Sequence, residues 1–267
     1  MPKCADCSSD VGVGEHLVCQ SCKDKHEEAL FKEPPQNEDC PICFLTLPIM
    51  STGSKYQTCC GKIICSGCIH AVQTMDSDAK CPFCRVPLPT SDEEMIERYK
   101  KRIKMDDAVA MYCLGCCYNE GKRGLPQNYA KALEIWHRAA ELGGVRAYYN
   151  IGCAYYLGRG VERDMKKTKH YWELAAIGGG VMARYNLGIY EEMVGDMSRS
   201  LNHYMIAAEC GYDKSLKKIR EFYMNGHATK DDYANALRAH QSYMDGIKSA
   251  QRDEAASAYD NDKYRYR

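Results

Sequence analysis

The 267-residue chain lacks the features that mark membrane, secreted and nucleic-acid-binding proteins. It has no run of about 18 apolar residues, so we expect no membrane span. The N-terminal stretch MPKCADCSSD has no apolar segment after its basic residue, which argues against a secretory signal. Lys and Arg total 36, as do Asp and Glu, so no overall charge attracts nucleic acid or an anionic membrane. We therefore expect an intracellular protein, cytoplasmic or nuclear, without membrane or nucleic-acid partners.

Cysteine, by contrast, is abundant and unevenly placed. Of 17 cysteines, 12 fall within residues 4–84. Such a region is either a disulfide scaffold or a metal-bound module, and in a reducing compartment the thiols remain available as ligands. Most of them form C-x-x-C pairs, which can point both sulfurs at one ion roughly 2.3 Å away, and a tetrahedral site takes two such pairs. The sequence therefore predicts zinc.

Three of these pairs lie in residues 40–84, and the adjacent Cys59 and Cys60 supply a fourth pair. The gaps between successive cysteines are two, fifteen, zero, four, two, twelve and two residues. The segment resembles a RING finger of the all-cysteine type. The resemblance implies two zinc ions in a cross-brace, one held by Cys40, Cys43, Cys65 and Cys68, the other by Cys59, Cys60, Cys81 and Cys84. The commonest RING pattern has a histidine where this chain has Lys62, whose protonated amine is a poor ligand. His70 is the alternative to one of the adjacent cysteines.

A further set of cysteines near the N-terminus has the spacing of a zinc ribbon: Cys4, Cys7, Cys19 and Cys22. We expect two short hairpins around one zinc within residues 1–30, because about 25 residues cannot bury a core unaided. His16 and His26 are alternative ligands, and a disordered cysteine-bearing tail is the alternative structure.

The rest of the chain repeats itself. The pattern A-x-x-x-[LI]-G recurs from Ala110, Ala147 and Ala183, at intervals of 37 and 36 residues. An aromatic residue follows at Trp136, Trp172 and Tyr204, and each unit then has an Ala-Ala pair and a glycine (Gly143, Gly178 or Gly211) that we expect to cap a helix in the left-handed conformation. The order and period resemble Sel-1-like repeats, relatives of the tetratricopeptide repeat, over residues 108–247. This resemblance implies about four stacked helix hairpins. The expected fold is mainly α: a helix-hairpin solenoid preceded by small zinc-stabilised α+β modules.

Two segments flank the predicted repeats. Residues 91–106 begin with a capping-box pattern, Ser91 to Glu94, and carry an apolar stripe at Met95, Tyr99 and Ile103, so we expect a linker helix that docks on the first repeat. Residues 250–267 are polar, and we expect them to fray.

The sequence shows no nucleophile–base pair, and a zinc ion with four thiolates has no open position for catalysis. An enzyme of this kind acts by holding its partners. The RING resemblance implies a ubiquitin ligase that binds a ubiquitin-charged conjugating enzyme through Ile42, Val72 and Pro82. Arg85 then bridges ubiquitin and that enzyme, and the repeats recruit the protein substrate. Val72 stands where many such ligases have tryptophan. The alternative is a non-catalytic zinc-dependent adaptor.

Overall fold

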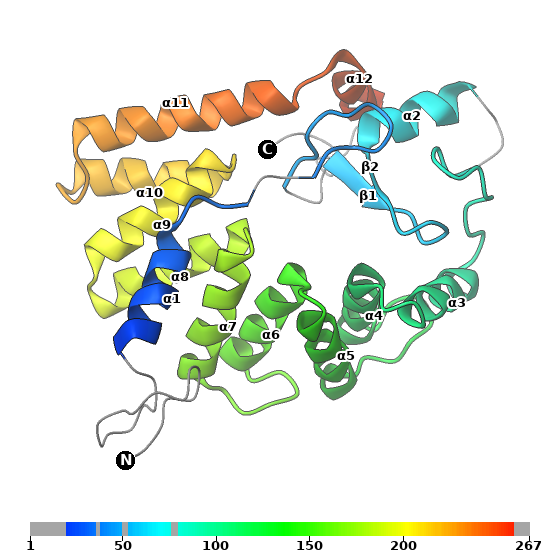
Figure 1. Ribbon diagram of the computed structural model, residues 1–267, viewed down its shortest axis with the longest axis horizontal. Coiled ribbons are helices and arrows are strands. Elements are labelled where there is room, and N and C mark those ends of the chain that lie inside the picture. Colours follow the sequence, from blue (N-terminus) through cyan, green and yellow to red (C-terminus); the bar gives the residue numbers. More distant parts are fainter. Residues whose placement is uncertain (1–19, 36–37, 50–52, 76–79, 259–267) are drawn as a thin grey trace.

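The computed structural model describes residues 20–35, 38–49, 53–75 and 80–258. The helices follow one another along a curved row, and the cysteine-rich unit (residues 38–88) lies between the two ends of that row (Figure 1). Among the described residues, no helix combines the length and the apolar character needed to cross a bilayer.

Four helix hairpins form the curved row. They pair in sequence order, as the repeat period predicts: α4 (Ala108–Glu120) with α5 (Tyr129–Glu141), α6 (Val145–Leu157) with α7 (Met165–Ile177), α8 (Val181–Val194) with α9 (Met197–Glu209), and α10 (Asp213–Met224) with α11 (Lys230–Ile247).

The glycine of each repeat makes room for the aromatic residue of the same hairpin. A Cβ atom on Gly115 would lie 2.3 Å from Nε1 of Trp136, and one on Gly152 would lie 2.4 Å from the ring of Trp172. The two helices of a hairpin therefore approach closely only because these glycines have no side chain. The predicted left-handed caps are present at Gly143 and Gly211, with φ of 80° and 79°. The prediction for Gly178 is wrong, since its φ is −75° and the next glycine takes the left-handed conformation instead.

The cysteine-rich unit is a small α+β module. Strands β1 (Ser54–Tyr56) and β2 (Ile63–Cys65) pair antiparallel, and helix α2 (Ser66–Met75) follows directly. Its interior consists of a few aliphatic side chains and the cysteines themselves, with Ile64, Ile69 and Leu47 buried among them. A core this small cannot by itself offset the entropy of ordering the segment, and metal ions held by its cysteines would supply the missing stabilisation.

Helix α3 (Asp92–Ile103) joins this module to the hairpins. Ser91 accepts a hydrogen bond from the Glu94 amide at 3.2 Å, while the Glu94 carboxylate accepts one from the Thr90 amide at 2.9 Å. The helix buries Ile96 and Tyr99 against α4. It therefore fixes the module on the first hairpin rather than tethering it loosely.

Two described helices differ from what the sequence predicts. Residues 20–31 form helix α1 (Gln20–Phe31), so the second hairpin expected within residues 1–30 is wrong for this part. Residues 250–258 form helix α12 (Ala250–Ala258), which packs on α2, so a fraying tail is wrong here too. Both are polar helices with little amphipathic pattern. Their packing against other elements therefore has to supply the stability that the local sequence does not.

Candidate metal centre

The eight cysteines of residues 40–84 gather in two sets. Each set offers four sulfur atoms that lie within 4.8 Å of one another: Cys40, Cys43, Cys65 and Cys68 in the first, and Cys59, Cys60, Cys81 and Cys84 in the second. The first set combines the first and third pairs of the chain, and the second set combines the second and fourth. The structure thus brings together the two interleaved groups that the RING resemblance implies. His70 lies half-exposed on α2 and belongs to neither group.

The sulfur separations fit a tetrahedral ion. Metal–sulfur bonds of about 2.3 Å give a tetrahedron whose edges are about 3.8 Å long. In the first set the sulfurs of Cys40 and Cys68 lie 3.9 Å apart and those of Cys43 and Cys65 lie 3.7 Å apart. In the second set the corresponding values are 3.9 Å for Cys60 and Cys81, and 3.3 Å for Cys59 and Cys84. All of these separations are well beyond the roughly 2.05 Å of a disulfide bond. Each of the two sets could therefore hold one metal ion.

The first and last pairs sit on turns of the same geometry. The Cys40 amide donates to the carbonyl of Leu45 at 2.9 Å, and the Phe44 amide donates to the carbonyl of Cys40 at 2.9 Å. The last pair repeats both bonds at the same offsets, at 2.8 Å and 3.0 Å, through Cys81, Val86 and Arg85. Phe44 and Arg85, each directly after the second cysteine, are left-handed, with φ of 57° and 63°. The turn therefore strains one non-glycine residue in order to present both sulfurs.

The adjacent cysteines sit on a third turn of this kind. Here the Gln57 amide donates to the carbonyl of Lys62, and the Gly61 amide donates to the carbonyl of Gln57, both at 2.8 Å. Gly61 is left-handed as well, with φ of 73°. Gln57 therefore occupies the place of a first cysteine, and Cys60 occupies the place of a second. Cys59 joins its set from a position that holds no cysteine in the other two turns. The sequence predicted both cysteines as ligands but did not reveal the register of their turn.

The second set favours a bound cation electrostatically. Burial raises the pKa of the Cys59 thiol above its ordinary range, and its neighbours Cys84 and Cys81 raise it further. Burial also raises the pKa of Cys60, again with a contribution from Cys81. The thiols of Cys59 and Cys60 thus hold their protons unless a positive charge lies beside them, and a coordinated metal ion would remove those protons.

Both ends of the helical row contact the cysteine-rich unit. At the first hairpin, the Tyr56 hydroxyl donates to Asp107 at 2.7 Å, and Asp107 also pairs with Arg102 at 2.7 Å while capping α4. At the far end, the buried Arg252 of α12 donates to the carbonyls of Thr46 at 2.9 Å and Leu45 at 3.2 Å. The cysteine-rich unit is therefore fixed from two sides by parts of the chain about 145 residues apart (107 and 252).

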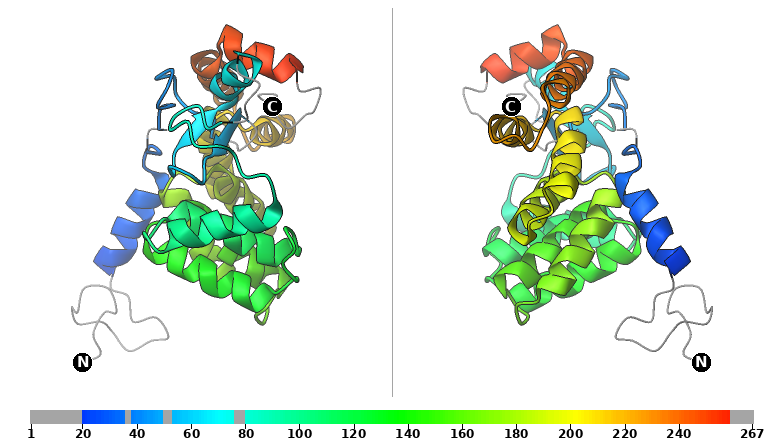
Figure 2. Two further views of the ribbon diagram at one scale, coloured as in Figure 1. Left: turned by 90° about the vertical axis from the view of Figure 1, so that its right-hand side faces the viewer. Right: turned by 90° about the vertical axis from the view of Figure 1, so that its left-hand side faces the viewer.

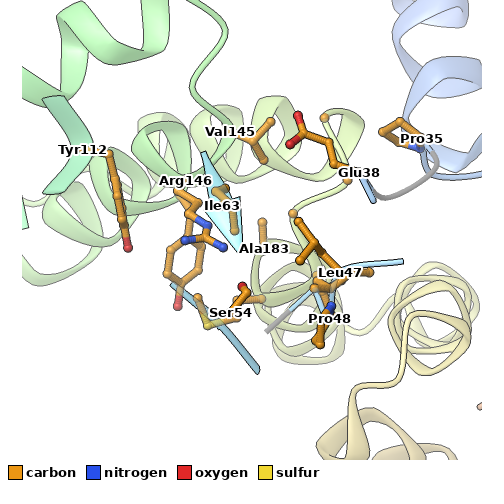
Figure 3. A pocket seen from close by; sticks show the side chains of 17 residues that line it. Pro35, Glu38, Leu47, Pro48, Ser54, Ile63, Tyr112, Val145, Arg146 and Ala183 are labelled. Atoms are coloured by element: carbon orange, nitrogen blue, oxygen red, sulfur yellow. The ribbon is translucent and has the colours of Figure 1, made fainter. Parts of the chain in front are cut away.

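Between these two contacts, the unit and the hairpins enclose an open cavity of about 460 Å³. Figure 3 shows its walls, with Tyr112 and Arg146 on the hairpin side and Glu38 and Pro48 on the side of the cysteine-rich unit. The cysteine-rich unit thus rests on the helical row at its edges and leaves a gap in the middle.

The predicted partner-binding residues remain accessible to different degrees. Ile42, Val72 and Pro82 are half-buried, and Arg85 is exposed. The sequence analysis did not single out Phe44 (77% exposed), although its place after the first C-x-x-C pair matches that of Arg85 after the last. An exposed aromatic residue at this position adds apolar area beside Ile42 for a partner.

The ribbon prediction rests mainly on residues outside the described part of the chain, namely Cys4, Cys7, His16 and Cys19. Cys22 lies on α1. His26 also lies on α1, and its Nε2 is 3.1 Å from the Glu173 carboxylate of α7. This contact orients the ring of His26 towards the repeats.

Comparison with known families assigns the helical region. A model of the Sel1 repeat matches residues 108–144 and 145–180. The C-terminal region carries Sel1 repeats. The two matched segments coincide with the hairpins α4–α5 and α6–α7, which confirms the repeats predicted from the sequence. No family model of a RING or another zinc finger matches the cysteine-rich unit, and no curated protein matches the chain.

Solved structures with Sel1 repeats are similar to this chain. The crystal structure of a Sel1 repeat protein from Oxalobacter formigenes is 27% identical, with a TM-score of 0.51, over 58% of this chain and 64% of that one. The crystal structure of c5321, a protective antigen of uropathogenic Escherichia coli with an SLR fold, is 27% identical, with a TM-score of 0.49, over 61% of this chain and 36% of that one. The chain thus spans less than two thirds of either protein. The first structure supports the solenoid fold of the Sel1 region.

Proposed function

We propose that the protein is a zinc-dependent RING-type ubiquitin ligase whose Sel1 repeats recruit the substrate. The observation that carries this proposal is the interleaving of two four-sulfur sets, because a cross-brace holds three turns and one helix in a fixed arrangement. The Sel1-repeat fold itself supports the coarser role of a protein-interaction scaffold or adaptor.

The cross-brace would position a docking face without taking part in chemistry. Two zinc ions would hold the turn that bears Ile42, the turn that bears Pro82 and the helix that bears Val72. Zinc supplies structure here, since four thiolates leave it no open coordination position. Such a face accelerates ubiquitin transfer by restricting the orientation of the charged conjugating enzyme before reaction.

Arg85 has the exposure and the placement that this mechanism needs. It follows the last cysteine directly, and its left-handed backbone is fixed by the bond from its amide to Cys81. A guanidinium on a rigid turn can bridge two proteins through several donors at once. In our proposal it contacts both ubiquitin and the conjugating enzyme.

An autoubiquitination assay with zinc-loaded protein and a panel of conjugating enzymes tests the ligase proposal. We expect transfer with at least one enzyme, and at least a ten-fold loss of rate in Ile42→Ala and in Arg85→Gln. Arg123→Gln is the matched control, because Arg123 is also left-handed and lies between α4 and α5, outside the two cysteine sets. Inactivity of the wild-type chain with every enzyme rejects the proposal.

A non-catalytic adaptor is the second candidate. It is favoured by Val72, which offers a partner less area than the tryptophan common in active RING ligases. A pull-down separates the two functions. Stable protein partners together with no binding to any charged conjugating enzyme select the adaptor, whereas binding that Ile42→Ala abolishes selects the ligase.

A further inference from the structure

Helix α1 packs on α7, α8 and α9, on the flank of the helical row (Figure 2). The residues that it covers there, among them Trp172, Leu187 and His203, are called the groove below. Leu30 is fully buried against Trp172 and Leu187. The ring of Phe31 packs on His203 of α9, with centroids 4.8 Å apart. Leu30 is the one fully buried side chain of the helix. Because an isolated helix of 12 residues is marginal in water, α1 is held mainly by the last turn that enters the groove.

The floor of this groove departs from the repeat pattern. In the second repeat, the ring of Tyr171 stacks on those of Tyr148 and Tyr155, with centroids 6.5 Å and 5.7 Å away. The repeat intervals of 36 and 32 residues place charged or polar side chains at the same positions of the third repeat, namely Arg184, Glu191 and His203. All three are at most 2% exposed. Burying such groups is costly unless they meet a partner. Glu191 meets Lys169 at 2.8 Å and Arg199 at 3.5 Å, so Arg184 and His203 are the two groups whose presence indicates a surface that recognises something polar.

Helix α1 satisfies these groups only in part. The Arg184 guanidinium donates to the carbonyl of Leu30, at the C-terminal end of α1, where helix carbonyls have no partner of their own. Arg199 forms an ion pair with Glu27 of α1. Neither ring nitrogen of His203 has a hydrogen-bond partner among the described residues. A ligand with one more acceptor at this depth would therefore bind better than α1 does.

We propose that this groove binds a short helix of a partner protein and that α1 occupies it in cis as a displaceable substitute. The pattern of α1 defines the ligand: a glutamate one turn before a Leu-Phe pair, as in Glu27, Leu30 and Phe31. The proposal rests on the repeats being the recruiting arm of the proposed function, but its test involves no ubiquitin transfer.

A labelled peptide of residues 20–35 with Cys22→Ser measures the groove directly. Fluorescence polarisation compares its binding to the full zinc-loaded chain and to the variant Leu30→Ala/Phe31→Ala, in which α1 is weakened but the groove is intact. A tethered competitor acts at millimolar effective concentration, so with an intrinsic Kd on the order of 10 μM the variant binds the peptide about 100-fold more tightly. A peptide that also carries Glu27→Ala, Leu30→Ala and Phe31→Ala is the matched control and does not bind.

A double-mutant cycle then locates the peptide in the groove. In the variant chain, Arg199→Gln weakens binding of the peptide about ten-fold. Glu27→Gln in the peptide weakens binding to the chain that keeps Arg199 but has no additional effect once Arg199 is replaced. Equal binding by the wild-type and variant chains, or independent effects of the two changes, overturns the proposal. Hydrogen exchange on the wild-type chain is a second measurement that needs no variant. We expect α1 amides to exchange at least ten-fold faster than those of α8, and equal protection would make α1 a permanent part of the fold.

Discussion

Arg252 offers the sharpest test of how the cysteine-rich unit is held. Its side chain is fully buried and donates to three backbone carbonyls, those of Thr46, Leu45 and Ile247, the last at 2.7 Å. In Arg252→Ala the Leu45 carbonyl keeps its bond from the Cys40 amide, whereas the bonds to Thr46 and Ile247 are lost.

The size of the effect follows from these two carbonyls. Leaving a buried acceptor unsatisfied costs about 1–3 kcal/mol, so two of them weaken the docking of α12 by about 3 kcal/mol. Since 1.4 kcal/mol corresponds to a factor of ten, the undocked state becomes about 100-fold more populated. Hydrogen exchange measures this population directly, and amides of α12 in Arg252→Ala should exchange about 100-fold faster than in the wild type.

The location of the change is as important as its size. Amides of α6 should exchange as in the wild type. Of the two zinc ions in our proposal, one should pass to a chelator faster, because Leu45 and Thr46 follow the turn that bears the first cysteine pair. Gly67→Ala probes the same contact by sterics, since the new Cβ would lie 2.9 Å from the backbone nitrogen of Arg252. Arg238→Ala, at an exposed position of α11, is the control. Unchanged exchange in α12, or an equal increase in every helix, would refute the reasoning.

Three further outcomes are expected. Native mass spectrometry should show that Cys59→Ala binds one zinc ion fewer than the wild type. Adding Gln57→Cys should restore that ion, because position 57 is the unused ligand position of the turn. If the ion is not restored, the assigned register of the turn is wrong. Burial, together with nearby cationic side chains, lowers the pKa of His203 to about 3. The unfolded state therefore takes up the proton first, so stability should be full above pH 6.5 and fall by up to about 1.4 kcal/mol per pH unit below it. Denaturant titrations should show this loss in the wild type and a smaller one in His203→Phe. Tyr56→Phe should cost about 2 kcal/mol in the same assay, because it removes a hydrogen bond to the ionised Asp107, and no change would mean that this contact does not hold the unit.

The sequence predicted the parts of the molecule that have a period or a fixed spacing. The repeat interval predicted the Sel1 hairpins, and the resemblance to a RING finger predicted which sulfurs meet. The helix after the cysteines was predicted from its capping residues: Ser91 accepts from the Glu94 amide as expected, whereas Glu94 accepts from the Thr90 amide instead of that of Ser91. The signals for the repeats and for this helix are local, because capping and apolar periodicity act within a few residues.

The sequence failed where a polar residue is stabilised by a distant part of the chain. Arg252 lies in a segment with few apolar residues, and its partners are carbonyls more than 200 positions earlier (45 and 46). Gln57 resembles any polar loop residue until its two backbone bonds reveal the turn. His203 lies within a recognisable repeat, and comparison with Tyr171 one unit earlier could have marked it as unusual.

Open solenoids tolerate the gain or loss of a unit, since each unit touches only its neighbours. This chain lacks that freedom, because α12 packs on α2 and the curved row of hairpins must place it there (Figure 1). Deleting or duplicating one hairpin would move α12 away from the surface of α2 on which it packs. The number of repeats in this chain thus has to match the width of the cysteine-rich unit, which belongs to none of them.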